Sequence, residues 1–398
     1  MIIKPRIRGF ICTTAHPKGC AANVDQQIAY VREQFADAAG SPEGPKRVLV
    51  VGASGGYGLS SRIVSAFGYG AQTLGVSFEK PPTAGKTATA GWYNNHAFEN
   101  RARDAGLYAH TIDGDAFSDE LKQQVIEAIR ADMGQIDLLV YSLASPVRTH
   151  PKTGVTHRSH IKPLGDTYRV KTLNVDKGDV YDVELEPATE EETAGTVAVM
   201  GGEDWEFWID ALSEAGVLAQ GFKTVSYTYL GSEITWPIYW HATLGKAKED
   251  LDRAAGALRQ RLKGLDGDAR VVALKAVVTQ ASSAIPVVPL YMTLLLHVMK
   301  KAGLHEDCIH QITRLFLTRL YDGDDVPLDD AERIRLDDWE LREDIQTEVK
   351  RRWPEITSEN LHELADIDGF RHDFLKIFGF GLPGVDYDED LDPTSTAI

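Results

Sequence analysis

Short apolar runs alternate with helical patterns through the first half of the chain. The runs are rich in valine, isoleucine and leucine rather than alternating in polarity, and they span residues 47–52, 72–78, 107–112 and 136–142. Continuous apolar runs are typical of parallel strands covered on both faces of a sheet. The helical patterns between them cover residues 57–67, 97–105 and 118–131. Two more strands, at 222–230 and 270–279, flank a long helical pattern near 239–263. We therefore predict an α/β fold with a doubly wound, Rossmann-type parallel sheet.

Three segments are additional to a minimal fold of this kind. An N-terminal extension covers residues 1–45, a β-rich insertion covers 146–202, and a helical C-terminal region covers 305–398. The chain contains no internal repeat and no low-complexity linker. These features favour one elaborated domain over residues 1–398 rather than two separable ones.

Charge and composition exclude several classes of protein. The formal net charge of −17 argues against general nucleic-acid binding, because phosphates would be repelled. The most apolar segment, 284–299, is too short to span a bilayer and contains two prolines. The cysteines, Cys12, Cys20 and Cys308, lack metal-ligand spacing, so we expect reduced thiols in a cytoplasmic enzyme and no metal site.

A glycine-rich segment directly follows the first predicted strand and opens a helix. A loop in this place lets the backbone approach a pyrophosphate, while the helix N-terminus supplies N–H groups and positive partial charge. Without a ligand it would be only a tight strand–helix turn. The predicted cofactor loop consists of Gly52, Ala53, Ser54, Gly55, Gly56 and Tyr57.

The ends of the other predicted strands carry residues suited to the rest of a dinucleotide. Glu79, after the second strand, can accept hydrogen bonds from ribose hydroxyls and would repel a 2′-phosphate, which favours NADH; neighbouring Lys80 could instead pair with such a phosphate. Asp115, after the third strand, could bind the adenine amino group or only cap the next helix. Small residues after the fourth strand, including Ala144, would let the backbone pass the nicotinamide ribose.

Tyr239 is a candidate catalytic residue, but its lysine partner is open from spacing alone. No tyrosine in the chain has a lysine four residues later, as ordinary short-chain dehydrogenases do. Lys246 would share a helix face with Tyr239 better than Lys248 would. That preference disappears if Tyr239 lies just before the regular helix, as Pro237 allows. Tyr239 could also be an aromatic packing residue beside two tryptophans.

The sequence resembles the trans-2-enoyl-CoA reductases, also called type V enoyl-acyl-carrier-protein reductases. The matching segments are GASGGYG at 52–58, YTYLGSEITWPIYWHATLGKAKEDLD at 227–252, LKAVVTQASSAIPVVPLY at 274–291 and FGFGLPGVDYDED at 378–390. The resemblance covers nearly the whole chain, including both terminal additions.

The resemblance implies a function and a set of site residues. It implies NADH-dependent reduction of the C2=C3 double bond of trans-2-enoyl thioesters, carried by acyl carrier protein or coenzyme A, as the last step of fatty-acid elongation, in a monomer. It also implies Tyr239 as proton donor, Lys248 as cofactor-binding lysine and Tyr229 as substrate contact. The implied NADH-binding residues are the glycine loop above together with Phe78, Glu79, Asp115, Ala116, Leu143, Ala144, Lys248, Val277, Val278 and Thr279.

Two other functions remain open at this stage. One is an enzyme of the same fold that reduces a ketone or epimerises a sugar nucleotide, which the missing Tyr–Lys spacing disfavours. The other is a non-catalytic dinucleotide-sensing protein, which a complete glycine loop with Tyr239 and Lys248 disfavours. The basic residues of the insertion have two possible roles: they could bind the phosphates of coenzyme A or the acidic face of an acyl carrier protein, or they could form a solvated face. These residues are Arg148, Lys152, Arg158, Lys162, Arg169 and Lys171.

Overall fold

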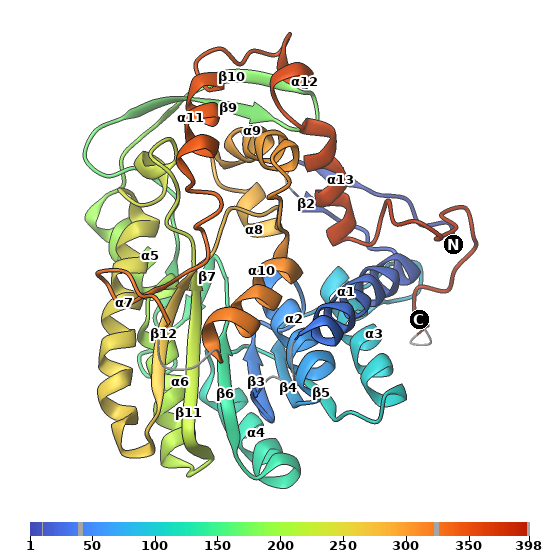
Figure 1. The fold of residues 1–398 in the computed structure, drawn as a ribbon, viewed down its shortest axis with the longest axis vertical. Coiled ribbons are helices and arrows are strands. Elements are labelled where there is room, and N and C mark those ends of the chain that lie inside the picture. Colours follow the sequence, from blue (N-terminus) through green and yellow to red (C-terminus); the bar gives the residue numbers. More distant parts are fainter. Residues whose placement is uncertain (10, 39–42, 322–325, 396–398) are drawn as a thin grey trace.

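The computed structural model describes residues 1–9, 11–38, 43–321 and 326–395 (Figure 1). Its centre is a seven-stranded sheet in which every neighbouring pair is parallel. The spatial order is β13 (Ile334–Arg335), β12 (Asp268–Ala273), β11 (Leu218–Thr228), β6 (Ile136–Tyr141), β3 (Arg47–Val51), β4 (Gln72–Ser77) and β5 (Ala109–Asp113). The strand order reverses at β3, so the predicted doubly wound sheet is confirmed.

Helices cover both faces of this sheet, which is why its strands read as continuous apolar runs. One core joins the strands to the helices α1 (Pro17–Asp37), α2 (Gly56–Ile63), α3 (Ala90–Asp104) and α10 (Cys308–Leu315). The core of the opposite face joins them to α4 (Asp119–Ala128), α6 (Glu203–Glu214) and α7 (Thr243–Leu262). Val48, Leu49, Val50 and Val51 are fully buried between the two layers.

Several predicted helices have different bounds in the structure. The helix α3 begins at Ala90 instead of 97, and α1, in the N-terminal extension, begins at Pro17. Ser118 caps α4, since its hydroxyl accepts a hydrogen bond from the Leu121 N–H at 3.1 Å. Within the described ranges, three helices end in π-helical turns: η1 (Val64–Gly68), η2 (Ile129–Met133) and η5 (Phe316–Leu320). The last predicted strand was too long, because β12 ends at Ala273.

The insertion holds two hairpins and one helix. The hairpins pair β7 (Val147–Thr149) with β8 (Thr156–Arg158), and β9 (Tyr168–Asn174) with β10 (Asp179–Leu185). The helix α5 (Glu190–Met200) follows and begins with a capping box at Thr189. The prediction of short strands was therefore right for the first part of the insertion and missed α5.

The last part of the chain folds over one end of the sheet. Figure 1 shows α9 (Val288–Lys301), α11 (Glu343–Arg352), α12 (Leu361–Leu364), α13 (Ile367–Ile377) and the β9–β10 hairpin gathered there. They share one apolar core. The helical C-terminal region is as predicted, but the two-residue strand β13 was missed. The remaining elements are β1 (Ile7–Arg8), β2 (Ile11–Cys12), η3 (Trp236–Ile238), η4 (Lys263–Leu265) and α8 (Gln280–Ser283).

The two chain ends meet at one side of the molecule (Figure 1). Lys18 pairs with Glu389 at 2.6 Å, and Lys4 pairs with Asp388 at 2.6 Å. No helix in the described ranges combines the length and apolar character needed to cross a membrane. The same ranges contain no cluster of three histidine, cysteine or acidic side chains that could hold a metal ion.

Candidate active site

The glycine loop is held close to the sheet by glycines that other residues could not replace. Gly52 has a φ of +87°, and a Cβ at this position would lie 2.3 Å from the carbonyl oxygen of Ser142. A Cβ on Gly58 would lie 1.9 Å from the carbonyl oxygen of Gly52. Gly55 caps α2, and nothing lies within 4 Å of where its Cβ would be. The loop is thus tightly packed at Gly52 and Gly58, whereas the N-terminus of α2 at Gly55 faces open space.

That open space is a cavity of about 950 Å³. Nine of the predicted cofactor residues line it, namely Ser54, Gly55, Gly56, Tyr57, Glu79, Ala144, Val277, Val278 and Thr279. The predicted residues that do not line it are Gly52, Ala53, Phe78, Asp115, Ala116, Leu143 and Lys248. Gly52 and Ala53 lie beneath the loop, where both N–H groups donate to the Val76 carbonyl oxygen at 2.9 Å. The cavity is of the size and position expected for a dinucleotide.

Glu79 points toward the glycine loop. The Ser54 hydroxyl donates to its carboxylate at 2.6 Å, and a Cβ on Gly91 would lie 2.1 Å from the same oxygen. The neighbouring Phe78 side chain is 80% exposed. This geometry puts a carboxylate at the β4 end of the cavity, where the adenosine ribose of a bound dinucleotide would lie.

The ends of β5 and β6 contribute less. The Asp115 carboxylate accepts from the Phe117 N–H at 3.0 Å, and this contact belongs to the turn that leads into α4. Ala116 is buried beside it. Leu143 and Ala144 follow β6, but of this pair only Ala144 reaches the cavity wall. The alternative role given to Asp115, shaping the start of the next helix, is the one its contacts display.

Sequence reasoning missed several residues of this cavity. Asn94 donates from its side-chain amide to the Ser54 carbonyl oxygen at 3.0 Å and lines the wall. The N-terminal extension contributes Gln27, and the C-terminal region contributes Asp307 and Lys376. These residues lie in helices, or in the case of Asp307 at a helix N-cap, whose sequences carry no glycine motif, so only the fold brings them to the loop.

Tyr239 lies before helix α7 rather than within it. It follows the short η3 helix with φ of −119° and ψ of −78°, and α7 begins at Thr243. Its side chain is 8% exposed, and burial raises the pKa of its hydroxyl, which keeps the group protonated. The Tyr229 ring packs edge-on against it, with 4.9 Å between ring centroids and an interplanar angle of 76°.

The two candidate lysines of α7 have different surroundings. Lys246 is exposed and pairs with Glu249 at 2.8 Å. Lys248 is partly buried, and within the described ranges its ammonium has no hydrogen bond or ion pair. Burial lowers the pKa of Lys248 to about 8, with the charge of Asp252 opposing the shift. Lys248 is therefore the lysine that is partly sheltered from water and uncommitted to an anion.

The Tyr229 hydroxyl does not lie free in the site. It donates to the buried Glu340 carboxylate at 3.0 Å, and burial raises its pKa well above the ordinary value. Sequence reasoning did not find Glu340, which lies in an acid-rich stretch where a single glutamate carries no signal.

The basic residues of the insertion are mostly committed to neighbours. Ion pairs join Arg148 to Glu203, Lys162 to Glu192 and Arg169 to Glu184. Lys171 donates to the Pro354 carbonyl oxygen at 2.7 Å. Arg158 is exposed. These contacts favour a charge-balanced structural role over a surface for carrier phosphates.

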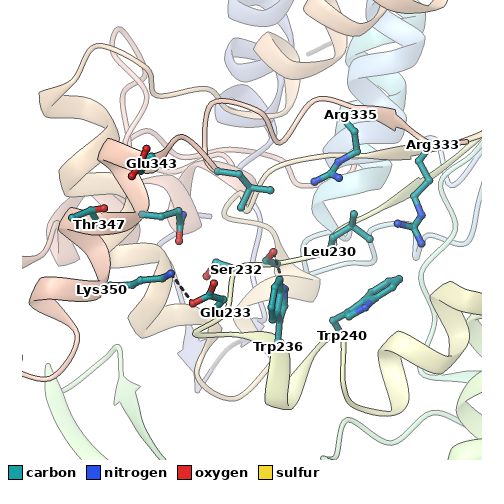
Figure 2. A pocket seen from close by; sticks show the side chains of 13 residues that line it. Leu230, Ser232, Glu233, Trp236, Trp240, Arg333, Arg335, Glu343, Thr347 and Lys350 are labelled. Atoms are coloured by element: carbon teal, nitrogen blue, oxygen red, sulfur yellow. Dashed lines mark hydrogen bonds and ion pairs between the residues drawn. The ribbon is translucent and has the colours of Figure 1, made fainter. Parts of the chain in front are cut away.

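A second cavity, of about 410 Å³, lies between the loop after β11 and helix α11. Figure 2 shows Trp236 and Trp240 on one wall, with the Glu233–Lys350 ion pair at one end of the site and Arg333 at the other. Arg333 is paired with Asp252 and lies 5.0 Å from the centre of the Trp240 ring.

Comparisons with family models cover three consecutive parts of the chain. Residues 2–84 match the NAD(P)H binding domain of trans-2-enoyl-CoA reductase, and residues 86–321 match the catalytic region of that enzyme. Residues 328–391 match a model described as an enoyl reductase FAD binding domain.

Curated and solved relatives agree with these matches. The chain is 58% identical to the NADH-dependent enoyl-[acyl-carrier-protein] reductase of Edwardsiella ictaluri, covering 99% of this chain and 98% of the relative. It is also 58% identical to the corresponding reductase FabV of Aeromonas salmonicida, with the same coverage. Among structures, trans-2-enoyl-CoA reductase from Treponema denticola in complex with NAD has a TM-score of 0.95, 50% identity and 98% coverage of both chains.

The described part of residues 328–391 does not fit a flavin dinucleotide. The glycine-containing segment around Gly379 is packed against α1 and leaves no room for a ligand there, since a Cβ on Gly19 of α1 would lie 1.7 Å from the Gly379 carbonyl oxygen. The first turn of α11 carries Glu343 and Asp344, which would repel a pyrophosphate. The cavity beside this helix has a volume of about 410 Å³, less than half of the about 950 Å³ of the cofactor cavity. Residues 328–391 therefore have a role other than flavin binding, and the buried contacts of this region indicate which role.

Proposed function

The chain belongs to the trans-2-enoyl-CoA reductase family, and from this premise we propose how its own residues carry out the reaction. It is an NADH-dependent enoyl reductase, which converts trans-2-enoyl thioesters to saturated acyl thioesters. The bound cofactor supplies a hydride to C3 of the substrate. The remaining task is to stabilise charge on the thioester oxygen and to deliver a proton, and both fall to the protein.

We propose that Tyr239 is the proton donor. The observation that supports this role is that Tyr239 is buried, protonated and outside α7. Lys248, about one helical turn into α7, is the nearby lysine whose ammonium forms no ion pair within the described ranges. As the enolate forms, the Tyr239 hydroxyl would donate its proton to the enolate oxygen, where negative charge develops; loss of a proton from that oxygen and protonation of C2 would then give the saturated thioester. Tyr229 would contact the substrate through its ring, because its hydroxyl is bound to Glu340.

Lys248 and the glycine loop would hold the cofactor. The N–H groups at the start of α2 suit the pyrophosphate, and Glu79 suits the adenosine ribose hydroxyls. We propose that Lys248 binds the nicotinamide ribose and, as a cation, favours ionisation of Tyr239 when this tyrosine gives up its proton. Val277, Val278 and Thr279 would pass along the nicotinamide, because they line the same cavity as the glycine loop.

The enoyl chain reaches the site as a thioester of acyl carrier protein or of coenzyme A. Acyl carrier protein and coenzyme A present the same thioester, and the insertion's paired charges favour neither. We further propose that the enzyme is a monomer and is located in the cytoplasm. Size-exclusion chromatography with light scattering would test the oligomeric state. Comparing kcat/KM for one enoyl chain on both carriers would identify the preferred one.

The test of the function follows NADH absorbance with crotonyl-CoA as substrate. The wild type should oxidise NADH, whereas a keto-reducing enzyme or a dinucleotide sensor would not. Tyr239→Phe removes only the hydroxyl, so NADH affinity should stay unchanged while kcat falls by about 100-fold or more. Near-normal turnover of this variant at saturating substrate would show that Tyr239 is not the donor.

A further inference from the structure

Glu340 is a fully buried carboxylate on the connection between β13 and α11. One of its oxygens accepts from the Tyr229 hydroxyl at 3.0 Å and from the Tyr291 hydroxyl at 2.7 Å. The other accepts from the Ala276 N–H at 2.6 Å. A buried carboxylate is costly unless donors surround it, so the fold holds these donors and the carboxylate in one fixed arrangement.

Each donor belongs to a different part of the candidate site. The Tyr229 ring packs edge-on against Tyr239. Ala276 immediately precedes Val277–Thr279, which line the cofactor cavity. Tyr291 lies in the first turn of the apolar helix α9 and also accepts a hydrogen bond from the Gln346 side-chain amide at 3.0 Å. One carboxylate therefore ties the proton donor's neighbour to the cofactor loop and to α9.

The charge of Glu340 is partly balanced by a nearby cation. Lys275 is 2% exposed, and its ammonium donates to the carbonyl oxygens of Ala276 at 2.7 Å and Glu306 at 3.1 Å. Burial raises the pKa of Glu340, and the positive charge of Lys275 and the Ala276 N–H oppose that rise. Asp337, on the same connection, is committed to Arg335 through both of its oxygens, at 2.8 and 2.7 Å.

We propose that Glu340 is a positioning residue for enoyl reduction, acting through Tyr229 on Tyr239 and through Ala276 on the cofactor loop. The proposal rests on the proposed role of Tyr239. Glu340 does not line the cofactor cavity, and both of its oxygens are bound to protein donors. It also gives residues 328–391 a function other than cofactor binding, because this region supplies the carboxylate on which three active-site elements converge.

The test is a double-mutant cycle with Glu340→Gln and Tyr229→Phe, measured with NADH and crotonyl-CoA. Glu340→Gln keeps the shape of the side chain and removes its charge. We expect kcat to fall by about 10- to 100-fold with little change in the KM for crotonyl-CoA, because misplacing a catalytic group lowers turnover rather than binding. The double variant should be no less active than the less active of the two single variants, because both substitutions break the same Tyr229–Glu340 hydrogen bond.

Asp337→Asn provides the matched control, since it alters another buried carboxylate three residues away. This variant should lower Tm while retaining kcat. Should Glu340→Gln fail to fold, Glu340→Asp carries the test, because its shorter side chain keeps the charge but cannot reach all three donors.

Two results would overturn the proposal. One is wild-type kcat in a folded Glu340 variant. The other is a double variant whose losses multiply, which would mean that Glu340 and Tyr229 act independently. Inactivity of the wild type with crotonyl-CoA would instead refute the proposed function, so the two failures are distinguishable.

Discussion

The two lysines near the start of α7 differ in their surroundings more than in their distance from Tyr239 along the chain. Lys248→Ala should weaken NADH binding by about 10-fold or more and lower kcat severely, because it removes the sheltered cation. Lys246→Ala should change neither, since this side chain forms an exposed pair with Glu249. NADH titration by fluorescence, followed by steady-state kinetics, measures both. Greater sensitivity at Lys246 would contradict the assignment of Lys248 as the cofactor-binding lysine.

Glu79 is the residue expected to set the choice between NADH and NADPH. Its carboxylate lies at the glycine loop and would be repelled by a 2′-phosphate. Glu79→Ala should narrow the preference for NADH chiefly by improving NADPH use, with Lys80 then free to pair with the phosphate. A 10-fold change needs only about 1.4 kcal/mol. Steady-state kinetics with both cofactors on both proteins measure the ratio, and an unchanged ratio would place selectivity elsewhere.

At the scale of elements, local patterns located the central strands and left some boundaries undetermined. Buried strands such as β3 and β6 are continuous apolar runs, so their sequence identifies them. The start of α7 could not be fixed by periodicity, because Tyr239 is held by the loop from Ser232 to Ile238 rather than by the helix. The strand β13 has only two residues, which is too short for any periodic signal. Glu340 escaped prediction because its role depends on three partners far away in the chain.

The glycine loop offers a paired test at this scale. Gly58→Ala places a methyl group against the Gly52 carbonyl oxygen, so we expect a loss of about 1–3 kcal/mol in the free energy of unfolding. Gly55→Ala meets no protein atom within 4 Å and needs no unusual backbone conformation. This second variant should keep its Tm and lose NADH affinity, since the added methyl would face the pyrophosphate. Chemical denaturation and NADH titration separate the two effects, and equal NADH affinity in wild type and Gly55→Ala would contradict the assigned loop.

At the scale of the whole molecule, the three family-model segments do not correspond to separate sheets. Strands β3 and β4 come from residues 2–84, β5, β6, β11 and β12 come from 86–321, and β13 comes from 328–391. The cofactor cavity is likewise lined from the N-terminal extension, the sheet and the C-terminal region. From this interleaving we propose that residues 1–398 form one elaborated domain.

A single folding unit should unfold in a single step. Calorimetry should give one transition whose van't Hoff and calorimetric enthalpies agree. NADH should move that whole transition to higher temperature, because the ligand binds only the folded chain; at 100 times its Kd it adds about 2.7 kcal/mol. Glu340→Gln should lower the same transition without splitting it, because the carboxylate joins β11, the loop after β12 and α9 to the C-terminal region. Two resolved transitions, of which only one shifts with NADH, would instead mean that the C-terminal region unfolds independently of the central sheet.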